Sequence, residues 1–542
     1  MKAALFILLV YLFGAVDPKE SIDLLVYNAT IYTVDNSFST TEAMAVKNGK
    51  IVATGTTQEL EGKYIPRQRL DAGGKFLYPG FIDAHAHFLG YGYTFQRVDL
   101  VGTITWEEVL DKTKAFAPSI PGTWIEGRGW DQNDWPVKEF PSNERLNELF
   151  PNRPVILTRI DGHAAIANRK ALEMAGIKAG DQLTGGEVEV KDGKLTGILV
   201  DRAIGLVTSR IPRPSKAQFT KAIVDAQKNC FAVGLTTIDD CGASAETVEA
   251  IKALYKAGTL KMRLYVMLSD DWKNYSYLEK TGIIKTDRLN VRSFKVYVDG
   301  ALGSRGACLL EPYSDKPGHT GFLLNAKDHY DSIANRIAKH GFQMCTHAIG
   351  DSGNRTMLNI YAKYLGKKND LRWRIEHAQV VDRNDFDLFG KYSIIPSVQP
   401  THATSDMYWA GDRLGKEREK GAYAYKELLS QNGWLPLGTD FPVEDISPFK
   451  TFFAAVVRKD SKGWPADGYQ PENALTREEA IRGMTIWAAK SNFEEKEKGS
   501  LEKGKWADFI LLDQDLMTTH ENMILQTNVL KTYIAGEKVY QK

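Results

Sequence analysis

The hydrophobic and polar positions follow one pattern at the two ends of the chain and another in its middle. Over 22–75, short alternating apolar runs separated by turn residues predict a small β unit. The last residues, 500–542, repeat this pattern. We therefore expect the two ends to pair into one discontinuous β-sandwich domain, with the rest of the chain inserted between them.

The middle, 76–495, alternates short apolar runs with stretches of helical spacing. In 214–234 apolar residues recur at three- and four-residue steps, Ser215 offers an N-cap and Gly234 can end the helix. Repeated strand and helix units imply parallel pairing, and eight of them predict an α/β fold, the (β/α)8 TIM-type barrel. The eight strand candidates are 76–83, 234–239, 263–268, 293–298, 342–346, 372–376, 392–398 and 435–439.

The first two strand candidates are separated by about 150 residues, far more than the dozen or so that a parallel crossover needs. We therefore expect an insertion at about 95–215. In barrels of this kind catalysis takes place at the carboxyl ends of the strands, so the chemically active side chains should gather there.

Composition and charge narrow the function classes. The chain has 542 residues, of which 43% are hydrophobic and 25% charged, as in a globular protein. Lys plus Arg (69) balance Asp plus Glu (68), so no broad field of one sign exists to recruit nucleic acid or anionic lipid. A small, roughly neutral molecule is the expected substrate.

Residues 1–16 contain one lysine followed by an almost unbroken apolar run, and polar residues follow. This layout predicts a signal peptide and hence an exported protein, periplasmic or extracellular. The alternative is an uncleaved anchor that tethers the protein to a membrane. The four cysteines are scattered in apolar segments, which favours free buried thiols, although export would permit a disulfide bridge.

Histidines stand at the ends of several predicted strands. His85 and His87 end the first strand and, one residue apart, point the same way. His347 and His377 follow the fifth and sixth strands, and Asp440 follows the eighth. Packing alone does not explain this placement, because a buried unpaired charge is costly. We predict that these five residues share a metal site.

Lys295 places a cation on an otherwise apolar strand, facing sites that should bind other cations. A bare ammonium group there would repel a metal ion. Two explanations remain open: either Lys295 pairs with Asp299, or its amine is modified into an anion.

Five ordered motifs carry a resemblance to a known family: PGFIDAHAH, KVYVDGALGSRGA, THAIGD, RIEHAQ and GTDFPVE. They resemble the amidohydrolase superfamily, and within it the branch of large amidohydrolases that includes N-substituted formamide deformylase. The likeness extends from about Asp23 to the C-terminus.

The resemblance implies a binuclear site that holds two divalent metal ions, usually zinc. Lys295, carboxylated to a carbamate, would bridge the two ions. The expected metal ligands are therefore His85, His87, Lys295, His347, His377 and Asp440, and all six positions are intact.

Two cations lower the pKa of a bridging water toward neutrality and polarise the scissile carbonyl. Asp440 can take the proton of this water and deliver it to the leaving nitrogen. We therefore expect hydrolysis of a carbon–nitrogen bond other than a peptide bond, in a small molecule such as an N-acyl or N-formyl amine. The alternatives are a lactone or ester hydrolase with the same two metals, and a metal-free binding protein on the same scaffold.

Further residues are candidates for the substrate pocket. His163 belongs to an Asp-Gly-His motif that resembles one in the family, and we expect it to steady the carbonyl oxygen. The sequence alone explains it equally well as a loop or helix-cap residue. Trp130 and Asp131 could form a pocket wall, although core packing explains Trp130 equally well. Arg305 could bind a substrate carboxylate, and His402 follows the seventh strand, where substrate loops belong. We also expect a homodimer, which barrels of this kind often form.

Overall fold

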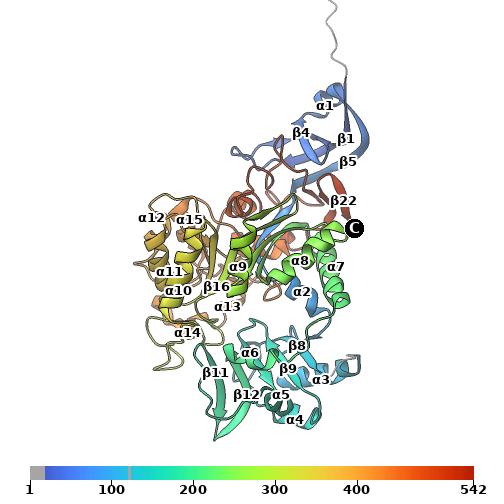
Figure 1. The fold of residues 1–542 in the computed structure, drawn as a ribbon. Helices are drawn as coiled ribbons and strands as arrows, with labels where there is room; N and C mark the ends of the chain where they lie inside the picture. The colour runs from blue at the N-terminus through green and yellow to red at the C-terminus, as the bar shows by residue number, and fades with distance from the viewer. Residues whose placement is uncertain (1–18, 120–123) are drawn as a thin grey trace, which may run out of the picture.

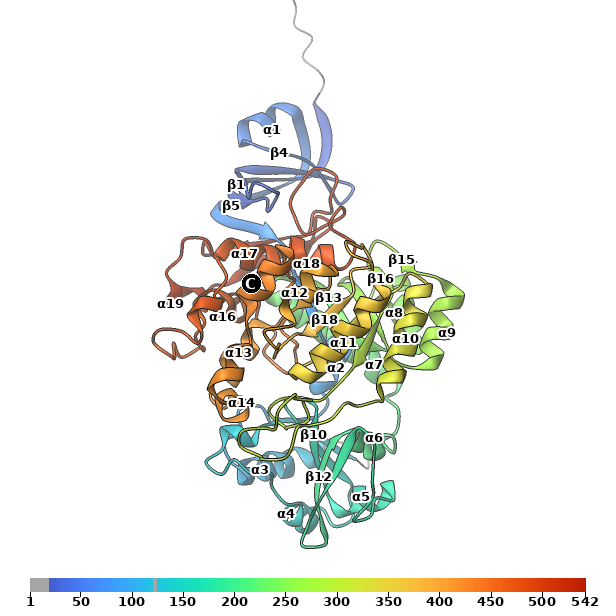
Figure 2. The same cartoon turned by 90° about the vertical axis from the view of Figure 1, so that its left-hand side faces the viewer.

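The computed structural model describes residues 19–119 and 124–542. The predicted signal peptide or anchor, 1–16, lies outside the described residues and stays a prediction. Three parts follow one another along the long axis of the molecule: a sheet built from both chain ends, a barrel, and an inserted domain (Figures 1 and 2). The barrel lies between the other two.

Parallel strands form the barrel in the order predicted. Seven of them pair with their neighbours in the order β6 (Phe81–Ala86), β13 (Leu235–Ala243), β14 (Arg263–Ser269), β16 (Leu289–Tyr297), β17 (Gln343–Ala348), β18 (Arg374–His377) and β19 (Ile395–Ser397). A short strand, β15 (Ile284–Lys285), pairs with β16.

The eighth predicted strand, 435–439, forms only an isolated parallel bridge between Leu437 and Val398. On its other side, Ala84 in β6 donates a backbone hydrogen bond to Leu437 at 3.1 Å. The segment thus links the first and the last strand of the sheet, and the predicted barrel fold is confirmed.

Helices cover the outside of the barrel, and local sequence explains the clearest of them. Helix α7 (Lys216–Ala232) begins with a capping box between Ser215 and Gln218, and Gly234 behind it has φ +85°, a conformation that favours glycine. The predicted helix is therefore present. The other helices of the barrel are α2 (Phe88–Thr94), α8 (Ala245–Lys256), α9 (Trp272–Thr281), α10 (Lys327–Lys339), α11 (Asp351–Tyr364), α12 (Phe386–Lys391), α13 (Pro400–Asp406), α14 (Ala410–Glu419), α15 (Tyr425–Asn432), α16 (Pro448–Val457), α17 (Arg477–Gly483) and α18 (Ile486–Ser491).

Both chain ends contribute to a single sheet. Strand β5 (Tyr64–Pro79) pairs with β1 (Glu20–Tyr32) on one side and with β20 (Phe509–Leu512), near the C-terminus, on the other. The pairing of the two ends was predicted. A β-sandwich requires two sheets packed face to face, so the predicted sandwich stays a prediction. The remaining members are β2 (Thr40–Thr41), β3 (Ala43–Lys47), β4 (Lys50–Gly55), β21 (Val529–Ile534) and β22 (Glu537–Gln541), with α1 (Thr57–Lys63) and α19 (Glu521–Ile524) in the connections.

The inserted domain lies where the long gap predicted an insertion, between α2 and α7. It has a mixed sheet of six strands and its own apolar core. Its elements are β7 (Val98–Asp99), α3 (Trp106–Phe116), β8 (Ile125–Trp130), α4 (Glu144–Leu149), β9 (Val155–Arg159), β10 (Ala164–Ala167), α5 (Arg169–Ala175), β11 (Gly186–Lys191), β12 (Lys194–Asp201) and α6 (Arg202–Thr208).

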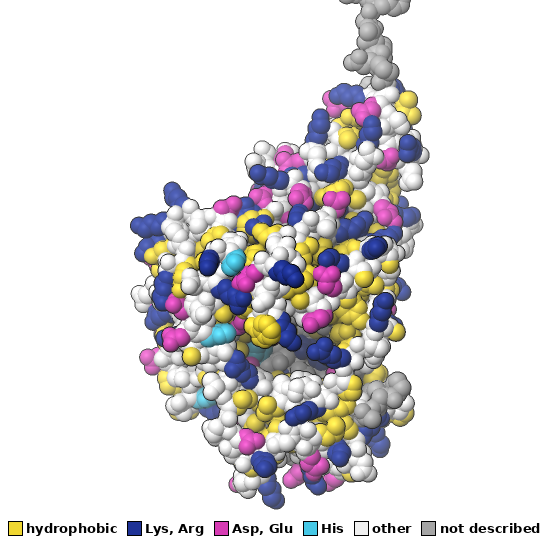
Figure 3. Space-filling model, in the orientation of Figure 1, with side chains coloured by type: hydrophobic (Ala, Val, Ile, Leu, Met, Phe, Trp, Pro, Cys, Tyr) yellow, Lys and Arg dark blue, Asp and Glu magenta, His cyan; other side chains and the backbone are white. Residues whose placement is uncertain are grey.

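The surface agrees with the balanced charge of the sequence. Basic and acidic side chains are interspersed over the face shown in Figure 3, so neither sign covers it. Within 19–119 and 124–542, no helix is both long and apolar enough to cross a membrane. All four cysteines are free, and Cys230, Cys241 and Cys345 are buried.

Candidate metal centre

The six predicted metal ligands converge at the carboxyl ends of the barrel strands. Ligand atoms of His85, His377 and Asp440 all lie within 4.8 Å of one another. His87 Nε2 is 3.2 Å from Asp440 Oδ1. The ring of His347 lies 4.7 Å from that of His377, and Lys295 Nζ lies 2.9 Å from His85 Nε2. Side chains from five separate segments thus surround one point.

Three of the histidines are oriented by an oxygen atom on the far side of the ring. His85 Nδ1 lies 2.5 Å from a carboxylate oxygen of Glu376, and His87 Nδ1 lies 2.9 Å from the carbonyl of Cys241. His377 Nδ1 lies 2.7 Å from Gln399 Oε1. When Nδ1 donates to these acceptors, the lone pair of Nε2 faces the centre, the arrangement that metal-binding histidines use.

The protein keeps the imidazoles of His85, His347 and His377 neutral. Burial and the nearby Lys295 lower the pKa of His85 to about 4. Burial, together with neighbouring imidazoles, also holds the pKa values of His347 and His377 well below the usual range. A neutral imidazole has the free lone pair that a metal ion requires, so protonation does not compete with the metal near pH 7.

The buried His347 Nε2 has no hydrogen-bond partner within the described part of the chain. Such atoms are rare in native proteins because an unsatisfied buried polar group costs free energy. Imidazole nitrogens and carboxylate oxygens are ligands that zinc accepts. The residues present therefore fit a divalent metal ion.

Lys295 is 1% exposed and contacts the ring of Tyr297, with Nζ 4.7 Å from its centroid. Asp299, the alternative partner considered from the sequence, instead accepts hydrogen bonds from the backbone amides of Cys308, Ile349 and Gly350. An ammonium group on Lys295 competes for the Nε2 lone pair of His85, so a metal ion and a charged Lys295 exclude each other.

A chain of polar side chains holds Asp440. His402 Nε2 lies 3.3 Å from Asp440 Oδ2, and His402 Nδ1 lies 3.1 Å from Glu444, which also accepts a hydrogen bond from Ser405. Burial would raise the pKa of Asp440, but His402 and His87 outweigh it and hold the pKa well below the usual range. Asp440 is therefore an ionised carboxylate in a fixed orientation.

The backbone at two of the ligands is strained. His377 has φ +72° and Asp440 has φ +63°, values in the left-handed region that non-glycine residues rarely adopt. Strain of this kind persists only where the surrounding structure enforces it, and it is concentrated at functional sites.

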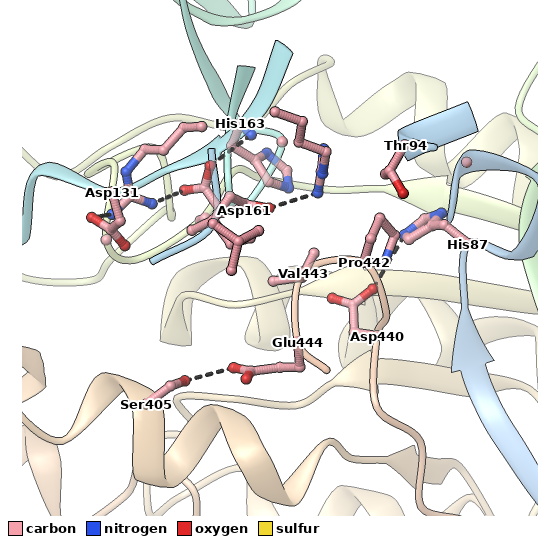
Figure 4. A pocket seen from close by; sticks show the side chains of 18 of the residues that line it. His87, Thr94, Asp131, Asp161, His163, Ser405, Asp440, Pro442, Val443 and Glu444 are labelled. Carbon is pink, nitrogen blue, oxygen red and sulfur yellow. Dashed lines mark hydrogen bonds and ion pairs between the residues drawn. The ribbon is translucent and has the colours of Figure 1, made fainter. Parts of the chain in front are cut away.

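The centre opens into a cavity of about 1400 Å³ between the barrel and the inserted domain. In Figure 4, Asp440 and His87 lie on the barrel side, and Asp161 and His163 lie across from them on the inserted domain. The barrel and the inserted domain thus each supply one wall of the cavity, and a substrate at the centre lies between them.

The structure brings some of the predicted substrate residues to this cavity and not others. His163 lies at the cavity with its ring 5.0 Å from that of His347, and Asp131 and His402 also line it. Trp130 does not: it is fully buried in the core of the inserted domain, where its indole N–H donates to Leu157. Core packing was thus the correct explanation for Trp130.

Arg305 also lies away from the lining of this cavity. Its guanidinium forms an ion pair at 2.9 Å with Asp315, which also pairs with Arg413, so Arg305 is held outside the cavity. The expectation that Arg305 binds a substrate carboxylate was therefore wrong, because it has a partner ten residues along the chain.

Several residues of the site were missed. Glu376 orients His85, Asp201 lies 2.6 Å from His163 Nδ1, and Asp83 accepts hydrogen bonds from His85 and Thr439. Glu376 could have been found, because RIEH places two charges on a strand that is otherwise buried. Asp201 and Asp83 could not have been found in this way, because only the folded chain brings them next to their partners.

Arg374 gives a testable prediction about stability. It is fully buried between Asp239 and Glu376, at 2.9 and 2.6 Å. Its replacement by methionine leaves both carboxylates without their cation, so we expect a destabilisation of about 3–5 kcal/mol and a lower melting temperature. Arg336, which pairs with Glu279 at the surface, is the matched control: its replacement should cost less than about 1 kcal/mol. Equal effects of the two substitutions would contradict this reasoning.

Known proteins that are similar to this chain include amidohydrolases and metal-dependent hydrolases. The chain is 32% identical to the putative amidohydrolase YtcJ of Bacillus subtilis over 94% of its own length and 98% of that protein's. It is 28% identical to N-substituted formamide deformylase of Arthrobacter pascens, over 96% and 98% of the two chains. An uncharacterised metal-dependent hydrolase from Pyrococcus horikoshii OT3 superposes with a TM-score of 0.75, at 27% identity, over 92% of this chain and 99% of the other. The model of the amidohydrolase family matches residues 68–540, and the chain belongs to that family.

Proposed function

We propose that this hydrolase cleaves a carbon–nitrogen bond of the amide type in a small molecule, with two zinc ions bound at the centre. The observation that carries the proposal is the convergence of four imidazoles, Lys295 and an ionised Asp440 at the mouth of the barrel. The similarity to a formamide deformylase supports an amide rather than another substrate.

We propose that His85 and His87 hold one ion, that His347 and His377 hold the other, and that Asp440 contacts the first. When bound, two divalent cations would lower the pKa of a water and polarise the carbonyl of the substrate. The net reaction adds water across the C–N bond, so that the acyl part leaves as a carboxylic acid and the nitrogen part as an amine.

Asp440 is the group that can move protons in this reaction. It is ionised, and His402 fixes one of its oxygens. It can accept a proton from the attacking water and give it to the leaving nitrogen. His163 lies on the opposite wall, fixed by Asp201, and can donate a hydrogen bond to the carbonyl oxygen of the substrate.

We propose that Lys295 is carboxylated. The amine lies 2.9 Å from a ligand atom of His85, so an ammonium at this position opposes the binding of a metal ion. Carboxylation removes the positive charge and supplies two oxygen atoms, which are suitable ligands for two neighbouring cations. The same modification therefore removes the repulsion and completes the site.

A substrate panel with and without metal tests the function. The purified chain, loaded with zinc, should hydrolyse simple N-formyl and N-acyl amines faster than lactones or esters of the same size. Removal of the metal with a chelator should abolish turnover, and added zinc should restore it. A preference for lactones or esters would replace the amide assignment, and turnover that survives the chelator would contradict the metal-dependent mechanism.

A further inference from the structure

Three arginines of the inserted domain line the cavity: Arg97, Arg128 and Arg159. Two of them are neutralised by acidic partners. Arg97 forms an ion pair with Glu126 at 2.9 Å, and Arg159 contacts both Asp131 and Asp161. These two arginines have no charge left for a ligand.

Arg128, on β8, is different. Among residues 19–119 and 124–542 no carboxylate lies within ion-pair distance of its guanidinium, which donates one hydrogen bond, at 2.6 Å, to the backbone carbonyl of Ile160. Its Nε is buried and has no hydrogen-bond partner within the same residues. The cavity wall therefore contains a permanent positive charge whose hydrogen-bonding capacity is mostly unused.

The position of Arg128 relates it to the metal centre. Its Nη1 packs against Gly162, so closely that a Cβ on this glycine would lie 3.1 Å away. The next residue is His163, whose ring lies 5.0 Å from that of the metal ligand His347. A molecule held at the centre and reaching toward the inserted domain therefore meets Arg128 beside His163.

The chemistry of the guanidinium indicates what it binds. Asp161 interacts with Arg128 electrostatically, but it forms its ion pair with Arg159 and leaves the guanidinium of Arg128 without a carboxylate in direct contact. A carboxylate from a ligand can make that contact through two parallel hydrogen bonds. Asp134 also lines the cavity, but it is exposed and thus hydrated, so it provides a weaker reason to expect a cationic ligand.

We propose that Arg128 binds a carboxylate group of the substrate, so that the amide cleaved at the metal centre belongs to an N-acyl or N-formyl amino acid. This inference rests on the proposed function and adds the substrate class to it. In the reaction, water adds to the acyl carbon and the C–N bond breaks. The acyl group becomes a carboxylic acid, the nitrogen of the amino acid takes up a proton from the water, and the carboxylate of the amino acid remains at Arg128 until both products are released.

A matched pair of substrates tests the assignment. N-formylphenylalanine and N-formylphenethylamine differ only in the carboxylate. With the zinc-loaded full chain, we expect Arg128→Gln to raise KM for N-formylphenylalanine roughly tenfold to a hundredfold with little change in kcat, as expected for a lost charged hydrogen bond in the bound state. KM for N-formylphenethylamine should change less than about threefold. Unchanged turnover of this neutral substrate also shows that the variant is folded.

The control is Arg97→Gln, which removes a cation of the same wall that Glu126 already neutralises. It should alter neither substrate's KM more than about threefold. The proposal is overturned if the unmodified protein does not prefer the carboxylate substrate, or if Arg128→Gln weakens both substrates equally.

Binding, measured by calorimetry with the same pair, separates this inference from the proposed function. If neither formamide is hydrolysed but N-formylphenylalanine binds more tightly, and Arg128→Gln removes the difference, the amide hydrolase assignment fails while the carboxylate site stands. If both are hydrolysed and bind equally, the carboxylate site fails while the hydrolase assignment stands.

Discussion

We expect the substitution Asp440→Asn to lower kcat by roughly a thousandfold or more when zinc is saturating, because asparagine cannot accept the proton of the attacking water. The amide preserves the shape of the side chain and can still bond to His402, so the fold should be unchanged. Measurement of kcat, bound zinc and melting temperature on the same preparation tests this. A variant that retains zinc and folds normally but turns over slowly identifies Asp440 as the proton-transferring group.

Asp445 is the matched control for Asp440. It also lines the cavity, but it is exposed and pairs with Lys450. Asp445→Asn should leave kcat within about threefold of the unmodified protein. If the two variants are equally impaired, or if Asp440→Asn keeps most of its activity, Asp440 does not transfer the proton.

The second large effect is expected at Lys295. Replacing it by alanine removes the proposed bridging carbamate, so we expect a loss of at least one zinc ion per chain and a fall in kcat of roughly a hundredfold or more. The space left by the side chain should admit a small carboxylate. Acetate or propionate should therefore restore part of the activity and of the zinc content of this variant.

Lys450→Ala is the control, because this lysine is exposed at the same cavity and pairs with Asp445. Neither acetate nor propionate should change its activity. For the unmodified protein, growth with 13C-labelled bicarbonate should give a carbamate carbon signal in the NMR spectrum that Lys295→Ala lacks. Full activity of Lys295→Ala, or a failure to detect the carbamate in the zinc-loaded protein, would show that Lys295 does not bridge the metals.

The barrel could be predicted from the sequence because short, mainly apolar runs alternate with stretches of helical spacing. The segment 435–439 was the least regular of the eight: it makes one bridge, to Val398, rather than a ladder. Its neighbours on both sides hold it by backbone hydrogen bonds, which a hydrophobic pattern does not reveal. Whether the end sheet packs as a sandwich also depends on contacts between distant segments, on which local periodicity gives no information.

The ligands of the candidate site could be predicted since strand ends in a parallel barrel meet at one rim. The predicted ligands His85, His87, His347, His377 and Asp440 therefore followed from their positions at strand ends, whereas the role of Lys295 as a ligand was implied only by the resemblance to the family. The residues that orient the ligands did not follow in this way, because their partners are far away in sequence: 291 residues separate His85 from Glu376. Arg305 was a pocket candidate because it follows the strand of Lys295, and Trp130 because it lies near carboxylates in the insertion. For both, the structure provides a partner within the protein instead.

The division of the cavity between two parts of the chain has a consequence for how this protein could diversify. Substitutions in the inserted domain can alter the molecule that is recognised without disturbing the reactive groups across the cavity. Chimaeras that exchange 95–215 between relatives, with His163 and Asp201 kept, should therefore inherit the selectivity of the donor and the chemistry of the recipient.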